Sequence, residues 1–82
     1  MPKALFLPPY PAQWFSGREA IIVPAAASIF ALVRALDAEA PGFAALAERR
    51  AAVAVNGQAI ADWSMRLDER DEVLFVPKIA GG

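Results

Sequence analysis

The sequence predicts one small α+β domain in which short strands precede and follow a single main helix. Short apolar runs bounded by proline or polar residues occur near both ends of the chain, and runs of this length are typical of strands. One longer segment repeats its apolar residues at helical spacing. The chain has 82 residues, 57% of them hydrophobic, which suits one core and is too short for two domains.

Two strands are expected before the helix. Residues 3–7 (KALFL) form an apolar run that is too short for a helix, and residues 19–23 (EAIIV) form a second one. Residues 8–17 between them hold three prolines, a glycine and three aromatic residues. We expect a loop there because proline cannot donate to a β-ladder. The two runs would then pair as a hairpin.

The main helix is expected to follow Ser28, whose hydroxyl can accept a hydrogen bond from an unpaired N–H of the first turn. The apolar residues from Ile29 to Leu36 recur at i, i+3, i+4 and i+7. The pair Pro41-Gly42 is expected to end the helix.

Two further segments lie on either side of a predicted hairpin. Residues 43–50 (FAALAERR) could form a short second helix, with Arg49 and Arg50 as a C-terminal pair that complements the helix dipole. Residues 62–70 are polar and turn-like. The expected packing anchors in the turns and loops are Trp14, Trp63, Met65 and Leu67.

Three strands are expected in the second half of the chain. Residues 51–55 (AAVAV) precede Asn56-Gly57, a strong hairpin signal because both positions tolerate positive φ. Residues 58–61 would return as the second strand of that hairpin. Residues 72–77 (EVLFVP) form the last strand.

The first and last strands contain the uninterrupted apolar runs 4–7 and 73–76, which is typical of central strands covered on both faces. A single main helix covers only one face, so alternate side chains lack an internal partner: Leu5 and Leu7 point opposite to Phe6. An exposed apolar sheet face usually marks a partner site. The alternative is that residues 8–17 fold back over this face.

Composition excludes several classes of function. The chain has no cysteine and no histidine, so it offers no disulfide, no thiolate or imidazole metal site, and no Cys or His catalytic group. Eight basic and nine acidic residues give no basic excess for nucleic acid. The longest charge-free stretches have 14 residues and contain proline, too short to span a membrane. The start lacks signal-peptide features, so a cytoplasmic location is expected.

The chain ends in Ile79-Ala80-Gly81-Gly82, directly after the last expected strand. Glycines lack a Cβ, so such an end can thread a narrow channel. The five residues from Lys78 reach about 17 Å when extended. The terminal carboxylate would become an acyl donor once another enzyme activates it, for example as an adenylate. The alternative is a frayed tail or a cloning remnant.

The sequence resembles the MoaD/ThiS sulfur-carrier proteins. Residues 71–82 (DEVLFVPKIAGG) are similar to their ending, which has D-E-V, apolar residues, proline and a terminal Gly-Gly. Residues 53–57 (VAVNG) resemble their A-V-N-G turn, and residues 3–7 their first strand. The likeness covers most of the chain apart from residues 8–17. It departs from the family at Arg70, where glycine is usual, and at Lys78, where a second proline is usual.

The resemblance implies a ubiquitin-like β-grasp fold, with a mixed sheet over residues 1–77 and a flexible tail over residues 78–82. An E1-like adenylyltransferase of the MoeB/ThiF type would use ATP and Mg²⁺ to adenylate Gly82. A sulfurtransferase would then form the thiocarboxylate, with Gly81 supplying the reach. A large subunit of the MoaE type would take the sulfur for molybdopterin, in the molybdenum cofactor pathway. The chain is then a non-catalytic carrier subunit that itself binds neither ATP nor metal.

The resemblance also implies a partner surface. Its expected residues are Leu7, Ala59, Val76, Lys78, Ile79 and Ala80. The acidic cluster of Asp68, Glu69, Asp71 and Glu72 could steer the tail to a basic channel, or simply form a solvated turn. Three other functions stay open: a sulfur carrier for thiamine, tRNA thiolation or another pathway, a ubiquitin-like modifier of lysines, and a binding module with an inert tail.

Overall fold

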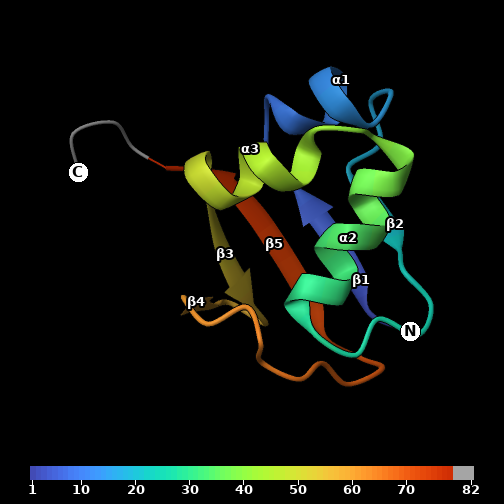
Figure 1. Cartoon of the computed structure of the whole chain (residues 1–82), viewed down its shortest axis with the longest axis vertical. Helices are drawn as coiled ribbons and strands as arrows, with labels where there is room; N and C mark the ends of the chain where they lie inside the picture. Colours follow the sequence, from blue (N-terminus) through green and yellow to red (C-terminus); the bar gives the residue numbers. More distant parts are fainter. Residues whose placement is uncertain (79–82) are drawn as a thin grey trace.

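The fold is a mixed five-stranded sheet with helices on one face (Figure 1). It was obtained as a computed structural model, which describes residues 1–78. The elements, in chain order, are β1 (Lys3–Phe6), α1 (Tyr10–Trp14), β2 (Ala20–Ile22), α2 (Ile29–Glu39), α3 (Phe43–Arg50), β3 (Ala51–Val55), β4 (Gln58–Ile60) and β5 (Glu72–Pro77). Within residues 1–78, the helices are too short or too polar to cross a bilayer.

The sheet has the strand order β2-β1-β5-β3-β4, so the last strand occupies its centre. β5 pairs in parallel with β1 and antiparallel with β3. The hairpin of β3 and β4 turns at Asn56-Gly57, both at positive φ, as predicted for this dipeptide. β1 and β2 are antiparallel. The parallel pair in mid-sheet agrees with the β-grasp expectation.

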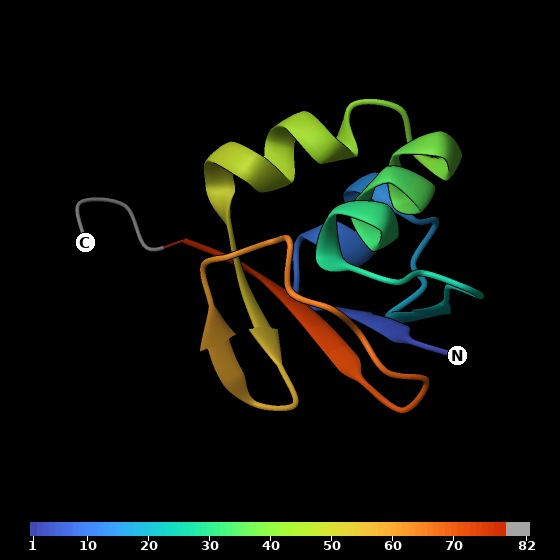
Figure 2. The same cartoon turned by 60° about the horizontal axis from the view of Figure 1, so that its bottom comes forward.

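The two longer helices pack over the same face of the sheet (Figure 2). The Ser28 hydroxyl accepts a hydrogen bond from the Ala31 N–H at 3.1 Å, which caps α2 as predicted. The predicted second helix, residues 43–50, is also present as α3. Side chains on this face of the central strands are buried, among them Phe6, Val73 and Phe75.

The prediction of a simple loop over residues 8–17 is wrong, because Tyr10–Trp14 forms the short helix α1. Proline is acceptable in the first turn of a helix, where its missing N–H has no intrahelical partner. Pro11 stands at that position. Tyr10 and Phe15 are buried in the main core, on the helix side of the sheet.

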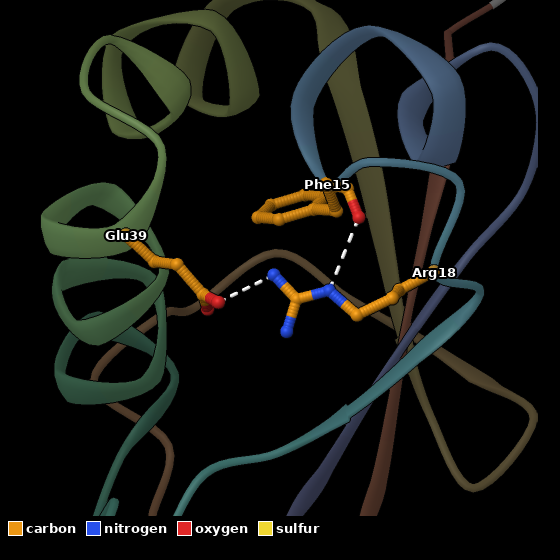
Figure 3. A network of polar contacts seen from close by, with 3 residues as sticks. All are labelled: Phe15, Arg18 and Glu39. Carbon is orange, nitrogen blue, oxygen red and sulfur yellow. Dashed lines mark hydrogen bonds and ion pairs between the residues drawn. The ribbon is translucent and has the colours of Figure 1, made fainter.

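An ion pair fixes the end of this segment to α2 (Figure 3). The Arg18 guanidinium lies between Glu39 at the end of α2 and the carbonyl oxygen of Phe15. Its Nε donates to the Phe15 oxygen at 3.1 Å, and a terminal nitrogen pairs with the Glu39 carboxylate. Because both partners are about half exposed, we expect this contact to orient the segment more than to stabilise the fold.

The core on the helix side is organised around the ring of Phe43, the first residue of α3. This ring is fully buried and meets five other aromatic rings with centroid separations of 4.9–6.0 Å. These neighbours are Phe6, Tyr10, Trp14, Phe15 and Phe75. The edge-to-face geometry of these pairs is favourable for aromatic quadrupoles. Three separate segments therefore meet at one side chain.

Gly42 turns the chain between α2 and α3 with φ +100°, and we expect its replacement by alanine to destabilise the fold. An alanine there is strained at this positive φ, and its Cβ lies 3.4 Å from the Trp14 ring. The expected loss is about 1–2 kcal/mol of the free energy of unfolding, measured by urea denaturation. Gly17→Ala is the control, because Gly17 has a similar φ of +86° but a Cβ added there has no atom within 4 Å. An unchanged unfolding midpoint for Gly42→Ala would contradict this account.

Candidate functional site

The face of the sheet opposite the helices carries a continuous set of apolar side chains, which we call the open face. The strand registers and the alternation of side chains along each strand define its members. They are Leu5, Leu7, Ala20, Ile22, Ala52, Ala54, Ala59, Leu74 and Val76. No helix of residues 1–78 lies over this face in Figure 2.

Three predicted partner residues lie together on the open face. Val76 pairs with Ala52, and Ala59 is opposite Ala54 in the β3–β4 hairpin. The Leu7 N–H donates to the Phe75 oxygen at 3.1 Å, which continues the β1–β5 ladder by one residue. Leu7 follows β1 and Ala59 lies on β4, three strands away in the sheet, which separates the two strands by about 14 Å. The structure thus groups these residues, while their role in docking stays a prediction.

The alternative in which residues 8–17 cover the open face is wrong. Their large side chains point into the helix-side core instead, where Tyr10 is 3% and Phe15 1% exposed. On the open face, by contrast, Leu7 is 45% and Ile22 53% exposed. An apolar surface that residues 1–78 leave uncovered is typical of a binding site for another protein.

β5 ends at the same end of the sheet as β1, close to Leu7. Its last residue, Pro77, is in register with Ala51, and the Lys78 N–H donates to the Arg50 oxygen at 2.8 Å. Lys78 is exposed and is the last described residue. The predicted site residues Ile79, Ala80, Gly81 and Gly82 lie outside the described residues.

Two grooves lie on either side of Lys78. The first, of about 620 Å³, is mainly apolar and includes Phe30, Ile60 and Trp63. The second, of about 660 Å³, lies between α1 and the end of α3 and includes Tyr10 and Arg49. Both therefore open at the point where the chain leaves β5.

Two groups near these grooves have shifted pKa values. Burial raises the pKa of the Tyr10 hydroxyl, and the nearby positive charge of Arg50 partly offsets this rise. The Asp62 carboxylate accepts hydrogen bonds from the hydroxyl and backbone N–H of Ser64, which lower its pKa. Among residues 1–78, no group of three or more acidic side chains is arranged to hold a metal ion.

The acidic residues that could steer the tail lie at the other end of β5. Asp71 accepts hydrogen bonds from the Asn56 amide and the Asp68 N–H, and the Asn56 oxygen accepts from the Glu72 N–H. These contacts hold a turn before the strand begins, whereas Lys78 follows the end of the strand. The solvated-turn interpretation of residues 68–72 therefore fits their position.

A model of the ThiS family matches residues 10–82, which is most of the chain and includes its end. The chain belongs to the ThiS family. Membership in the ThiS family supports a role as a sulfur carrier. No curated protein sequence matches the chain significantly.

Solved structures confirm the β-grasp fold of this ThiS family member. One is a complex of subunits 1 and 2 of the molybdopterin-converting factor from Helicobacter pylori, with 24% identity and a TM-score of 0.66 over 99% of this chain and 97% of that one. Another is the solution structure of the HVO 2177 protein of Haloferax volcanii, with 24% identity and a TM-score of 0.76 over 99% and 85%.

Sequence reasoning missed one feature of this ThiS-family chain, the cationic lining of the second groove. Arg49 and Arg50 were assigned only to the dipole of α3, and they do occupy its last turn. The register of β3 with β5 brings them beside Lys78, which follows Arg50 by 28 residues in the chain. Pairing of β5 with β1 was expected, but pairing of β5 with β3, which follows Arg50, was not predicted.

Proposed function

We propose that the chain is a sulfur carrier that works through the carboxylate of Gly82. An oxygen of this carboxylate attacks the α-phosphorus of ATP on an E1-like adenylyltransferase of the MoeB/ThiF type, and pyrophosphate leaves. Hydrosulfide (HS⁻) delivered by a sulfurtransferase then attacks the acyl carbon, AMP leaves, and the loss of one proton gives the thiocarboxylate. The observation that carries this proposal is the ThiS family match, which extends to residue 82.

The position of β5 supports this proposal. β5 is the central strand, hydrogen-bonded on both sides, and Lys78 directly follows it. Four more residues can extend the chain by at most about 14 Å beyond Lys78. A carboxylate at that distance can enter a partner's active site while the folded domain stays outside. The chain itself would bind neither ATP nor Mg²⁺, because the activating partner supplies both.

Within this function, we favour the small subunit of a molybdopterin synthase over other sulfur pathways. The Helicobacter pylori structure contains two subunits of a molybdopterin-converting factor, and one of its chains is similar to this one over nearly its full length. A large subunit of the MoaE type is the corresponding partner here. The second candidate is a carrier for thiamine synthesis, which the name of the matching family favours.

The intact mass of untagged protein from its native host tests the carrier function. We expect a species heavier by the exchange of one oxygen for sulfur, and absent from protein that lacks Gly82. Incubation with ATP, the host's adenylyltransferase and a sulfur donor should increase its amount. An unmodified mass under all these conditions would contradict the proposal. Conjugates on a denaturing gel would instead indicate a modifier of lysines.

The open face is expected to be the docking surface for these partners. Leu7→Asp places a charge beside Val76 near the end of β5, and should weaken binding to the large subunit about tenfold or more. Isothermal calorimetry with the host's large subunit measures this. Ile22→Asp is the matched control, because Ile22 is equally apolar and 53% exposed but pairs with Lys3 at the far end of the face. Equal losses for both variants would contradict a surface centred near the tail.

A further inference from the structure

A basic groove lies beside the end of β5, between α1 and the last turn of α3. Its volume is about 660 Å³. The groove is lined by Pro9, Tyr10, Gln13, Leu46, Arg49, Arg50, Pro77 and Lys78. Three of these side chains are cationic and none is acidic. The chain as a whole has a net charge of −1, so this concentration of positive charge is local.

Hydrogen bonds to one backbone oxygen fix the shape of the basic groove. The carbonyl oxygen of Arg50 accepts the Lys78 N–H at 2.8 Å and the Tyr10 hydroxyl at 3.3 Å. Three elements of the fold therefore meet at one oxygen atom. Because the register of Ala51 with Pro77 holds β3 against β5, the cations stay beside the start of the tail. The groove is therefore held in place by the contacts of the fold.

The cations of the basic groove have no acidic partner within residues 1–78. The ion pairs of this part of the chain join Lys3 to Glu72 and Arg18 to Glu39. The Nε atom of Arg49 donates only to a carbonyl oxygen of its own helix, that of Ala45, at 3.4 Å.

The dipole of α3 does not account for all of this charge. A helix C-terminus carries about half a negative charge, whereas the groove holds three positive charges. The nearest acidic residue in sequence, Glu48, lines the neighbouring apolar groove. The surplus favours an anionic ligand.

We propose that the basic groove binds carboxylate side chains of the protein that receives the tail, at the mouth of its channel. Gly82 lies at most about 14 Å beyond Lys78, so a channel deep enough for the tail brings its rim against this groove. A nucleotide at the reacting carboxylate would sit at the far end of that span. This identification of the partner rests on the proposed carrier function, whereas the preference for anions rests on the groove alone.

The first test is the kinetics of thiocarboxylate formation with the host's adenylyltransferase. For Arg49→Glu/Arg50→Glu we expect the KM for the carrier to rise about tenfold or more, with kcat unchanged, because rim charges act on encounter and docking. The KM of the wild type should also rise with salt, and that of the variant much less.

Arg34→Glu/Arg70→Glu is the matched control, because it changes the net charge equally with exposed arginines outside the groove. Equal effects of the two double variants would overturn the proposal. Glutamates at the end of a helix also oppose its dipole. The neutral pair Arg49→Gln/Arg50→Gln, with its Tm measured, therefore serves as a second variant.

The second test is independent of sulfur chemistry. The ¹⁵N-labelled chain is titrated with the peptide acetyl-Glu-Asp-Glu-Glu-amide and, separately, with inorganic phosphate. We expect saturable amide shifts centred on Arg49, Arg50 and Lys78 with the peptide, lost in the Arg49→Gln/Arg50→Gln variant. Shifts elsewhere, or phosphate binding as tightly as the peptide, would overturn the proposal. If the wild type never acquires sulfur, the carrier function fails and this titration still decides the groove.

Discussion

Appending one alanine after Gly82 is expected to abolish activation of the chain while leaving its Tm unchanged. The new carboxylate stands about 3.5 Å further along the chain. The added residue also carries a Cβ, which glycine lacks, into the channel that the proposal assigns to the partner. Misplacement of a reacting group by even 1 Å can cost about a hundredfold in rate, so no thiocarboxylate should form. Gly81→Trp should have the same effect, because its ring cannot pass the channel.

The matched control inserts one alanine between Met1 and Pro2, which gives the same mass and charge. Met1 is 62% exposed, and the N-terminus lies away from the end of β5 (Figure 1). Both proteins are incubated with ATP, the host's adenylyltransferase and a sulfur donor, and their intact masses are compared. Normal adenylation of the chain extended after Gly82 would show that the tail does not thread into the enzyme. It would also remove the main support for a role of Gly81.

Phe43→Ala is expected to cause the largest loss of stability of any single core substitution. The Phe43 side chain is 0% exposed and lies among the five aromatic rings that join α1, α3 and the central strands. Truncation of a buried phenylalanine typically costs about 3–5 kcal/mol. A domain of this length has a total stability of roughly 4–12 kcal/mol, so the variant should be close to unfolding.

Thermal denaturation followed by circular dichroism measures this effect, and we expect Tm to fall by more than about 12 °C. Phe30→Ala is the control, because Phe30 is 55% exposed and contacts one ring, Trp63, at 5.7 Å. Its loss should be about 1 kcal/mol. Similar Tm values for the two variants would show that the aromatic cluster does not hold the segments together.

Local chemistry was enough to predict most elements of this fold. The hydroxyl of Ser28, the stripe that begins at Ile29 and the stop at Pro41-Gly42 together located α2, because capping and periodicity act within a few residues. The Asn56-Gly57 turn was equally clear. Strand parity separated Leu7 from Phe6, but it could not say which side the helices would cover, because that choice depends on tertiary packing.

Two features could not be predicted because they depend on context. Residues 8–17 were expected to form a loop because their prolines cannot donate to a β-ladder, although a proline in the first turn of a helix is acceptable. What decides between loop and helix there is the burial of Tyr10 and Phe15 against Phe43, a contact distant in sequence. The basic groove likewise depends on the β3–β5 register, which sets Arg50 beside Lys78.

The central place of β5 also has a mechanical consequence. A partner that draws in the tail pulls on β5 along its own axis. β5 is bonded to β1 on one side and to β3 on the other, over four and five residue pairs. Such traction loads both ladders in shear, so many hydrogen bonds resist together, whereas an edge strand pulled sideways would peel bond by bond. The strand that carries the tail is thus the part of the sheet best anchored against force.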